Sequence, residues 1–148
     1  MLIYLDNCSF NRPFDDQSQI RIRIETEAKI HIQEQIIKGN LTLTWSYILD
    51  YENSANPFPE RKDAIGNWKK HAVSDIDASE EIIKRAEKLK KKGIKSKDAL
   101  HISCAIKLNC KYFITTDRGL IKKLGKFEQL YVLNPVDFIN IIEEKKKC

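Results

Sequence analysis

The chain has 148 residues, of which 42% are hydrophobic and 32% charged, and 26 basic against 21 acidic residues give a formal net charge of +5. This length fits one domain, residues 1–148, and the composition is that of a globular protein rather than of a disordered chain. Its four cysteines form no Cys-x-x-Cys pair, and its three histidines fall at no zinc-site spacing, which disfavours a disulfide scaffold or a structural zinc.

The longest apolar stretches are far shorter than the roughly 18 residues that a membrane span needs. The apolar run at the amino terminus stops at Asp6 and is too short for a signal peptide. We therefore expect a cytoplasmic protein with no membrane contact. The modest positive charge permits a polyanionic partner such as nucleic acid.

The first half of the chain alternates short apolar runs with helical patterns. Residues 2–5 predict a buried strand that leads into a loop containing Asn11, Arg12 and Pro13. Residues 18–38 lack Gly and Pro and predict an amphipathic helix, with an apolar stripe at every fourth position: Ile20, Ile24, Ala28, Ile32 and Ile36. Residues 41–45 predict a second strand, and Ser46 is placed to cap a helix that runs through residue 52.

The second half continues this alternation. Helices are predicted at 61–70, 79–92, from a cap at Ser96 to about residue 106, at 118–124 and from Asn134 onward, with a frayed tail over about 144–148. Strands are predicted at 71–76, as a short edge strand, and at 111–115 and 130–133. Such alternation is typical of an α/β fold, in which helices cover both faces of a mostly parallel sheet and ligands bind at the carboxyl ends of its strands.

Four acidic residues fall where they can meet at that edge of the sheet. Asp6 and Asp117 each follow a predicted strand, Asp98 lies in the first turn of a helix, and Glu52 lies on the helix after the second strand. Each has an ordinary alternative role, because Asp is common at helix caps and turns, Asp98 complements a helix dipole and Glu52 could be a surface acid.

Four carboxylates at one edge of the sheet require a counter-charge. At about 5 Å, each like-charged pair costs on the order of 3 kcal/mol at an effective dielectric of 20. Oxygen ligands with no adjacent His or Cys favour Mg²⁺ or Mn²⁺, which are usually completed by substrate phosphates. Such ions support hydrolysis of phosphodiester bonds.

Three motifs make the chain similar to PIN domains, the nuclease fold of VapC-like toxins in bacterial and archaeal toxin–antitoxin systems. They are Leu-Ile-Tyr-Leu-Asp-Asn at residues 2–7, Lys-Asp-Ala-Leu-His-Ile at 97–102 and Phe-Ile-Thr-Thr-Asp at 113–117. The resemblance implies a three-layer α/β/α fold and a Mg²⁺- or Mn²⁺-dependent endoribonuclease. It further implies that Asp6, Asp98 and Asp117 bind the metal, with Asn7 and Thr116 as partners of its waters or of the phosphate.

The family places a further catalytic acid on the helix after the second strand, and Glu52 is our candidate. Asp50 remains an alternative, because the commonest pattern has this acid sooner after the strand. Positions 50 and 52 differ by about 200° around a helix, so only one of them can face the site.

Other residues have open roles at this stage. Arg12 could contact substrate phosphate or be an ordinary surface residue, and His101 could support Asp98, face the substrate or simply pack in the core. The basic segment 84–97 is either a solvated helix face or a contact surface for the RNA backbone.

The partners implied by the resemblance are an RNA substrate, a small antitoxin protein and a second copy of the chain in a homodimer. The alternatives are a non-catalytic RNA- or protein-binding module and a housekeeping RNA-processing nuclease.

Overall fold

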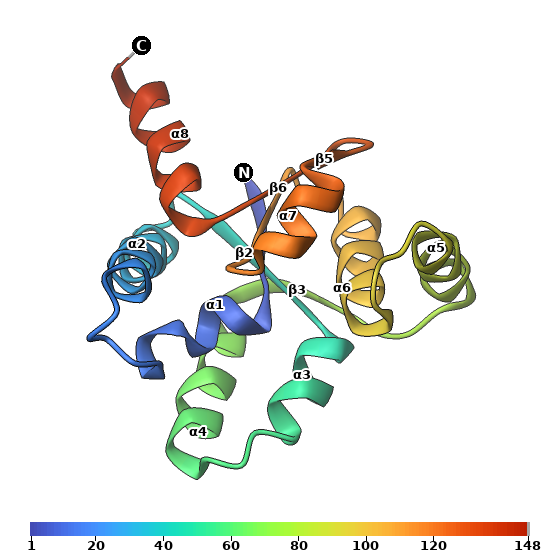
Figure 1. Cartoon of the computed structure of the whole chain (residues 1–148), viewed down its shortest axis with the longest axis horizontal. Helices are drawn as coiled ribbons and strands as arrows, with labels where there is room; N and C mark the ends of the chain where they lie inside the picture. Colours follow the sequence, from blue (N-terminus) through green and yellow to red (C-terminus); the bar gives the residue numbers. More distant parts are fainter. Residues whose placement is uncertain (148) are drawn as a thin grey trace.

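The computed structural model describes residues 1–147, and its central feature is one sheet with helices on both faces (Figure 1). The strands lie in the order β3-β2-β1-β4-β6-β5, and every neighbouring pair is parallel except β5 and β6. The strands are β1 (Leu2–Leu5), β2 (Thr42–Ser46), β3 (Ala72–Ile76), β4 (Tyr112–Ile114), β5 (Lys126–Phe127) and β6 (Leu130–Leu133). The predicted α/β fold with a mostly parallel sheet is confirmed, and β3 lies at an edge as expected.

The helices form the outer layers. They are α1 (Asn7–Asn11), α2 (Ile20–Ile37), α3 (Tyr47–Ser54), α4 (Pro59–Asn67), α5 (Glu80–Lys91), α6 (Ser96–Lys107), α7 (Arg118–Leu124) and α8 (Pro135–Lys147), with 3-10 turns η1 (Arg12–Phe14) and η2 (Trp68–His71). Helices α2 and α8 pack together on one side of the sheet, and α5 and α6 pack together on the other (Figure 1). This is the predicted three-layer arrangement.

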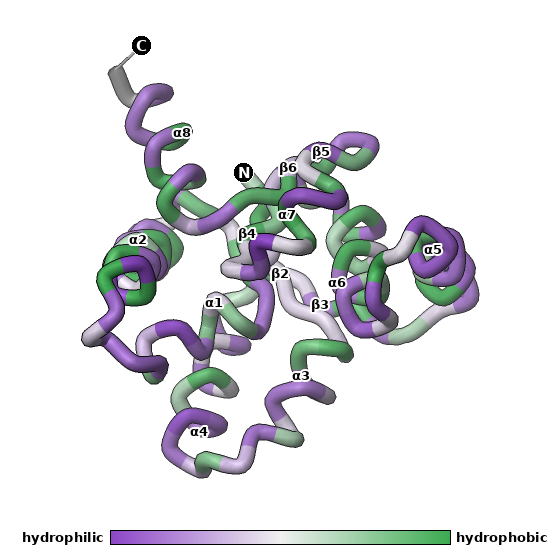
Figure 2. Tube along the Cα trace, in the orientation of Figure 1, coloured by the Kyte–Doolittle hydropathy of each residue, from purple (hydrophilic) through white to green (hydrophobic). Residues whose placement is uncertain are grey.

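The core lies between these layers. The central strand β1 is almost completely buried, and Ile102 and Ala105 of α6 are also fully buried. Figure 2 shows hydrophobic residues along β4 and β6 at the centre, whereas the outer side of α5 is hydrophilic. Within residues 1–147, no helix is both long enough and apolar enough to cross a membrane.

The predicted apolar stripe of α2 is only half correct. Ile32 and Ile36 are buried, but Ile20 and Ile24 are 64% and 46% exposed. Each step of four residues turns the chain by about 400°, so a stripe with this spacing drifts by about 40° per step and winds off the buried face. The first half of the helix instead buries two polar residues, Glu25 and Thr26.

Several short elements differ from the prediction. The loop expected after β1 begins with α1, whose first amide is capped by the Asp6 carboxylate, and β5 was not predicted. Helix α4 starts at Pro59, two residues earlier than expected, because proline suits the first turn of a helix. The N-cap of α6 is Lys95 rather than Ser96, and no side chain caps this helix. Helix α8 extends to Lys147 across most of the tail expected to fray, and Cys148 lies outside the described residues.

Candidate metal and active site

The carboxyl ends of three adjacent strands, β2, β1 and β4, form the centre of one sheet edge. The chain leaves β1 through Asp6 into α1, and it leaves β4 through residues 115–117 into α7. The register pairs Leu5 with Ile114, so these two exits are side by side. Parallel pairing therefore brings Asp6 next to residues more than 100 positions away.

Asp6 is held in place by both exits. It is 5% exposed, and its amide donates to the carbonyl of Ile114 at 2.9 Å. One carboxylate oxygen accepts the Asn7 amide at 2.8 Å, and the other accepts the Thr115 hydroxyl at 2.8 Å. The capping role and the position at the site are thus combined in one side chain.

Glu52 and His101 complete a compact group with Asp6. One ligand atom of each residue lies within 4.8 Å of the others, a grouping able to hold a metal ion. Nε2 of His101 hydrogen-bonds Oε1 of Glu52 and lies 3.8 Å from Oδ1 of Asp6. On the other side of the ring, Nδ1 lies 2.5 Å from the Tyr4 hydroxyl, which is 2.6 Å from the Ser46 hydroxyl. The imidazole is therefore fixed at both nitrogens.

The charges in this group support one another. Burial alone would lower the pKa of His101, but the Glu52 hydrogen bond and the surrounding carboxylates raise it overall. Burial would raise the pKa of Glu52, but His101, Lys97 and Asn7 together lower it. Both directions favour an imidazolium paired with a carboxylate.

Asp98 and Asp117 face each other across the adjacent part of the site. Both line a small cavity of about 100 Å³, together with Lys95 and Lys123. Asp117 is exposed and caps α7 by accepting the Leu120 amide at 3.1 Å. Burial and the charges of Asp6 and Asp117 raise the pKa of Asp98 to about 6. The other three candidate acids therefore all act on Asp98, since the charge of Glu52 also contributes to raising its pKa.

Glu52 and Asp50 point to different surroundings, as the helix geometry requires. Asp50 accepts the Trp45 indole N–H and the Lys69 ammonium, each at 2.9 Å, away from the other acids. Glu52 instead accepts from Asn7 Nδ2 at 3.4 Å and contacts His101. Of the two candidates, the structure places Glu52 beside the other acids.

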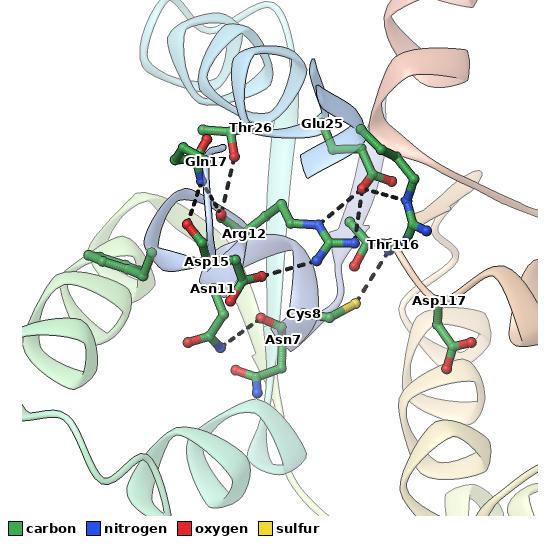
Figure 3. A network of polar contacts seen from close by, with 12 residues as sticks. Asn7, Cys8, Asn11, Arg12, Asp15, Gln17, Glu25, Thr26, Thr116 and Asp117 are labelled. Atoms are coloured by element: carbon green, nitrogen blue, oxygen red, sulfur yellow. Dashed lines mark hydrogen bonds and ion pairs between the residues drawn. The ribbon is translucent and has the colours of Figure 1, made fainter. Parts of the chain in front are cut away.

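Arg12 is engaged by acidic side chains of its own region. Its guanidinium lies 2.9 Å from Glu25 and 3.1 Å from Asp15, and its side chain is 13% exposed. Figure 3 shows the group turned toward these two carboxylates, with Asp117 outside the network. Its contacts therefore connect η1 to α2.

Two polar residues at the site, Thr115 and Tyr4, were missed from the sequence, whereas Thr116 was predicted. The hydroxyl of Thr115 donates to Asp6 and accepts the Asp117 amide at 3.1 Å, whereas the amide of Thr116 donates to the Cys8 sulfur at 3.3 Å. Tyr4 positions His101 from inside the sheet. The sequence feature that could have identified them is a polar side chain within an apolar strand, as for Tyr4, or at its end, as for Thr115.

The donor set fits a hard divalent cation. Carboxylate oxygens dominate, and one further oxygen, Oδ1 of Asn7, is buried with no hydrogen-bond partner among the described residues. The most compact group contains Asp6, Glu52 and His101, while Asp98 and Asp117 lie along the neighbouring cavity. Oxygen-rich sites of this kind suit Mg²⁺ and Mn²⁺.

Comparisons with known proteins agree with this architecture. A structure of VapBC2 from Rickettsia felis bound to a promoter DNA fragment is similar at a TM-score of 0.55 and 19% identity, covering 90% of this chain and 98% of the other. A VapBC-1 structure from nontypeable Haemophilus influenzae is similar at a TM-score of 0.57 and 19% identity, covering 92% and 99%. No curated protein matched in sequence. The family model of the PIN domain matches residues 4–126, and the chain therefore belongs to the PIN-domain family.

Proposed function

We propose that the protein is a Mg²⁺- or Mn²⁺-dependent endoribonuclease that hydrolyses RNA phosphodiester bonds, with the whole chain as one nuclease domain. The observation that carries the proposal is the convergence of Asp6, Glu52, Asp98 and Asp117, where burial and the neighbouring acids raise the pKa of Asp98 to about 6. Clustered acids at the carboxyl edge of a parallel sheet favour a cation and an anionic substrate. Membership of the PIN-domain family supports the same class of reaction.

The acids divide into two roles. Asp6, Asp98 and Asp117 would hold the metal, and Glu52 would orient a water molecule or a metal ligand from the α3 side. A bound divalent cation would neutralise charge that develops on the phosphate oxygens and make a water molecule more acidic. His101 keeps the Glu52 carboxylate in place through its Nε2 contact.

Neighbouring polar groups support this chemistry. Oδ1 of Asn7, which has no hydrogen-bond partner among the described residues, would accept from a water of the site, and Thr116 lies on the turn that carries Asp117. Arg12, by pairing with Glu25, stabilises the segment after α1 rather than reaching toward phosphate. Lys95 and Lys123 line the cavity with Asp98 and Asp117, where they can pair with RNA phosphates.

We further propose that the protein is the toxin of a toxin–antitoxin pair, acting in the cytoplasm and restrained by a small antitoxin protein. The support is its similarity in fold to two VapBC structures. A homodimer is part of this proposal. Expression of the wild-type chain alone should arrest growth, whereas expression of Asp98→Asn should not, and normal growth with both would overturn the toxin role.

The enzymatic proposal is tested on purified protein with single-stranded RNA. We expect cleavage with Mg²⁺ or Mn²⁺, none after EDTA, and a loss of at least about a hundredfold for Asp6→Asn and Asp98→Asn. Asp50→Asn is the matched control, because this acid lies on the same helix as Glu52 but outside the site. Cleavage that survives EDTA, or equal losses in Asp50→Asn and Asp98→Asn, would overturn the mechanism.

Calorimetry with Mn²⁺ provides a readout that does not depend on the RNA chosen. Wild-type protein should take up the ion, and Asp6→Asn should bind it at least about tenfold more weakly. A protein that takes up no Mn²⁺ would instead be a non-catalytic binding module.

A further inference from the structure

Away from the acidic site, α2 buries a lysine in a cavity that offers it no anion. Lys29 is 4% exposed and lines a cavity of about 190 Å³ between α1, η1, α2 and α4. Its ammonium lies over the rings of Phe10, at 5.5 Å from the centroid, and Trp68, at 5.9 Å. No hydrogen bond or ion pair reaches this ammonium within residues 1–147. Burial lowers its pKa to about 7.

A second donor lines the same cavity one helical turn later. Gln33 is 9% exposed, and its Nε2 has no hydrogen-bond partner in the described part of the chain. Residues four apart on a helix share a face, so the donors of Lys29 and Gln33 lie on the same side of α2. A buried donor left without an acceptor, as Gln33 Nε2 is within residues 1–147, is expensive and rare in native proteins. The cavity therefore lacks an acceptor, and a negatively charged one would satisfy both groups.

The rim of this cavity has the character of a protein interface. Phe14 and Ile30 line it and are 36% and 44% exposed. Next to Phe14, the guanidinium of Arg61 lies 5.5 Å from its ring centroid and 4.3 Å from that of Phe58, which is 51% exposed. Exposed aromatic and aliphatic side chains combined with arginine are typical of surfaces that bind other proteins.

We propose that this cavity is a docking pocket for an acidic side chain of a protein partner. The Glu or Asp carboxylate pairs with the Lys29 ammonium and accepts from Gln33 Nε2, while apolar neighbours of that residue cover Phe14 and Ile30. Ligand pockets usually measure roughly 300–1,000 Å³, so this smaller cavity fits one side chain rather than a nucleotide or cofactor. A backbone phosphate of RNA is flanked by sugars and cannot enter as a side chain does.

The experiment uses two capped peptides that differ only in charge, N-acetyl-Leu-Glu-Leu-amide and N-acetyl-Leu-Gln-Leu-amide. Their binding is followed through the indole N–H signals of the protein in NMR spectra, because the chain has two tryptophans and only Trp68 lines the cavity. The Glu peptide should shift the Trp68 signal saturably and leave Trp45 nearly unmoved. The Gln peptide should bind roughly tenfold more weakly, since it lacks the charge-assisted bond.

Variants show whether the pocket residues cause this difference. Lys29→Met, which keeps the apolar stem, should remove the preference for the Glu peptide, and Gln33→Leu should weaken Glu-peptide binding while leaving Lys29 in place. Lys62→Met, an exposed lysine on α4, is the matched control and should bind like wild type. Equal binding of both peptides, unchanged preference in Lys29→Met, or no saturable shift up to the solubility limit would overturn the proposal.

A second copy of the chain is the competing occupant. Sedimentation of wild type and Lys29→Met decides this point: equal masses agree with a different protein as partner. A dimer that dissociates only in Lys29→Met would assign the pocket to a second copy and overturn the proposal. None of these readouts involves RNA or metal, so they succeed or fail independently of the proposed nuclease activity.

Discussion

Asp98 is the candidate acid whose pKa is raised by burial and by the neighbouring carboxylates. Its pKa is raised from 3.8 to about 6 by burial and by the charges of Asp6 and Asp117. The folded protein therefore holds this proton more tightly than the unfolded chain does. The resulting stability is fully present below pH 3.8 and is lost as the pH rises through about 6.

Removing this charge should stabilise the metal-free protein while abolishing activity. With allowance for its partial exposure, Asp98→Asn should raise the free energy of unfolding at pH 7 by about 1 kcal/mol, and the gain should vanish below about pH 4. Urea unfolding in EDTA at the two pH values measures this effect. A gain of the same size at both values would contradict the electrostatic origin.

Lys29 has the opposite sign of pH dependence. Its pKa is lowered from 10.5 to about 7, so between these values the unfolded chain binds more protons and stability rises with pH. Lys29→Met should therefore raise the free energy of unfolding at pH 7 by on the order of 2 kcal/mol, and less as the pH approaches 10.5. Thermal unfolding across this range tests the prediction, with Lys62→Met as control. A destabilised Lys29→Met at pH 7 would contradict it.

At the scale of elements, α2 offers a matched pair of substitutions within one apparent stripe. Ile32 is completely buried and Ile24 is 46% exposed. Ile32→Ala should cost about 2–4 kcal/mol of stability because it leaves a cavity, whereas Ile24→Ala should change stability by less than about 1 kcal/mol. Denaturant unfolding of both variants measures the difference. Similar losses would mean that the stripe is buried along its whole length.

The elements also explain what could be predicted from sequence. The strands around the site are apolar runs that end at polar residues, and therefore Asp6 and Asp117 could be located at strand exits. The five-residue α1 is too short for any periodicity, and its start depends on a cap that only the structure shows. Glu52 and Asp50 could not be separated, because the rotation of α3 depends on its packing.

The register of the strands was a second feature that could not be predicted from the sequence. Thr115 matters because β1 and β4 pair so that Leu5 faces Ile114, which brings the Thr115 hydroxyl to Asp6. Tyr4 matters because its hydroxyl reaches His101 on α6. Contacts between residues about 100 positions apart follow from the alignment of strands and helices, which local patterns do not contain.

At the scale of the whole molecule, several basic residues of α5 gather along one surface groove. A groove of about 590 Å³ between α5 and the β5–β6 turn is lined by four basic and three acidic residues: Lys84, Arg85, Lys88, Lys92, Glu80, Glu81 and Glu128. Arg85 lies 3.8 Å from Glu128, and Lys92 lies over the Phe127 ring. Lys84 and Lys88 therefore remain the better candidates for RNA phosphates.

Salt dependence tests this assignment. Changing both Lys84 and Lys88 to Gln should weaken RNA binding and reduce the slope of log affinity against log salt by about 1.4, or about 0.7 per lost phosphate contact. Filter binding with single-stranded RNA at several salt concentrations measures the slope. The matched control changes Lys62 of α4 and Lys70 of η2, both exposed, to Gln, and an equal effect of the two pairs would mean that only net charge matters.

The central position of β1 in the sheet affects how the protein folds during synthesis. Strand β1 acquires its β4 partner only after residue 114 has been synthesised, and Asp6 gains its hydrogen bond from Thr115 only 109 residues later. Parallel pairing over such distances is slow to form, because the intervening loop must close first. The acidic site therefore assembles only after residue 117 has been synthesised, and a chain truncated before that residue lacks it.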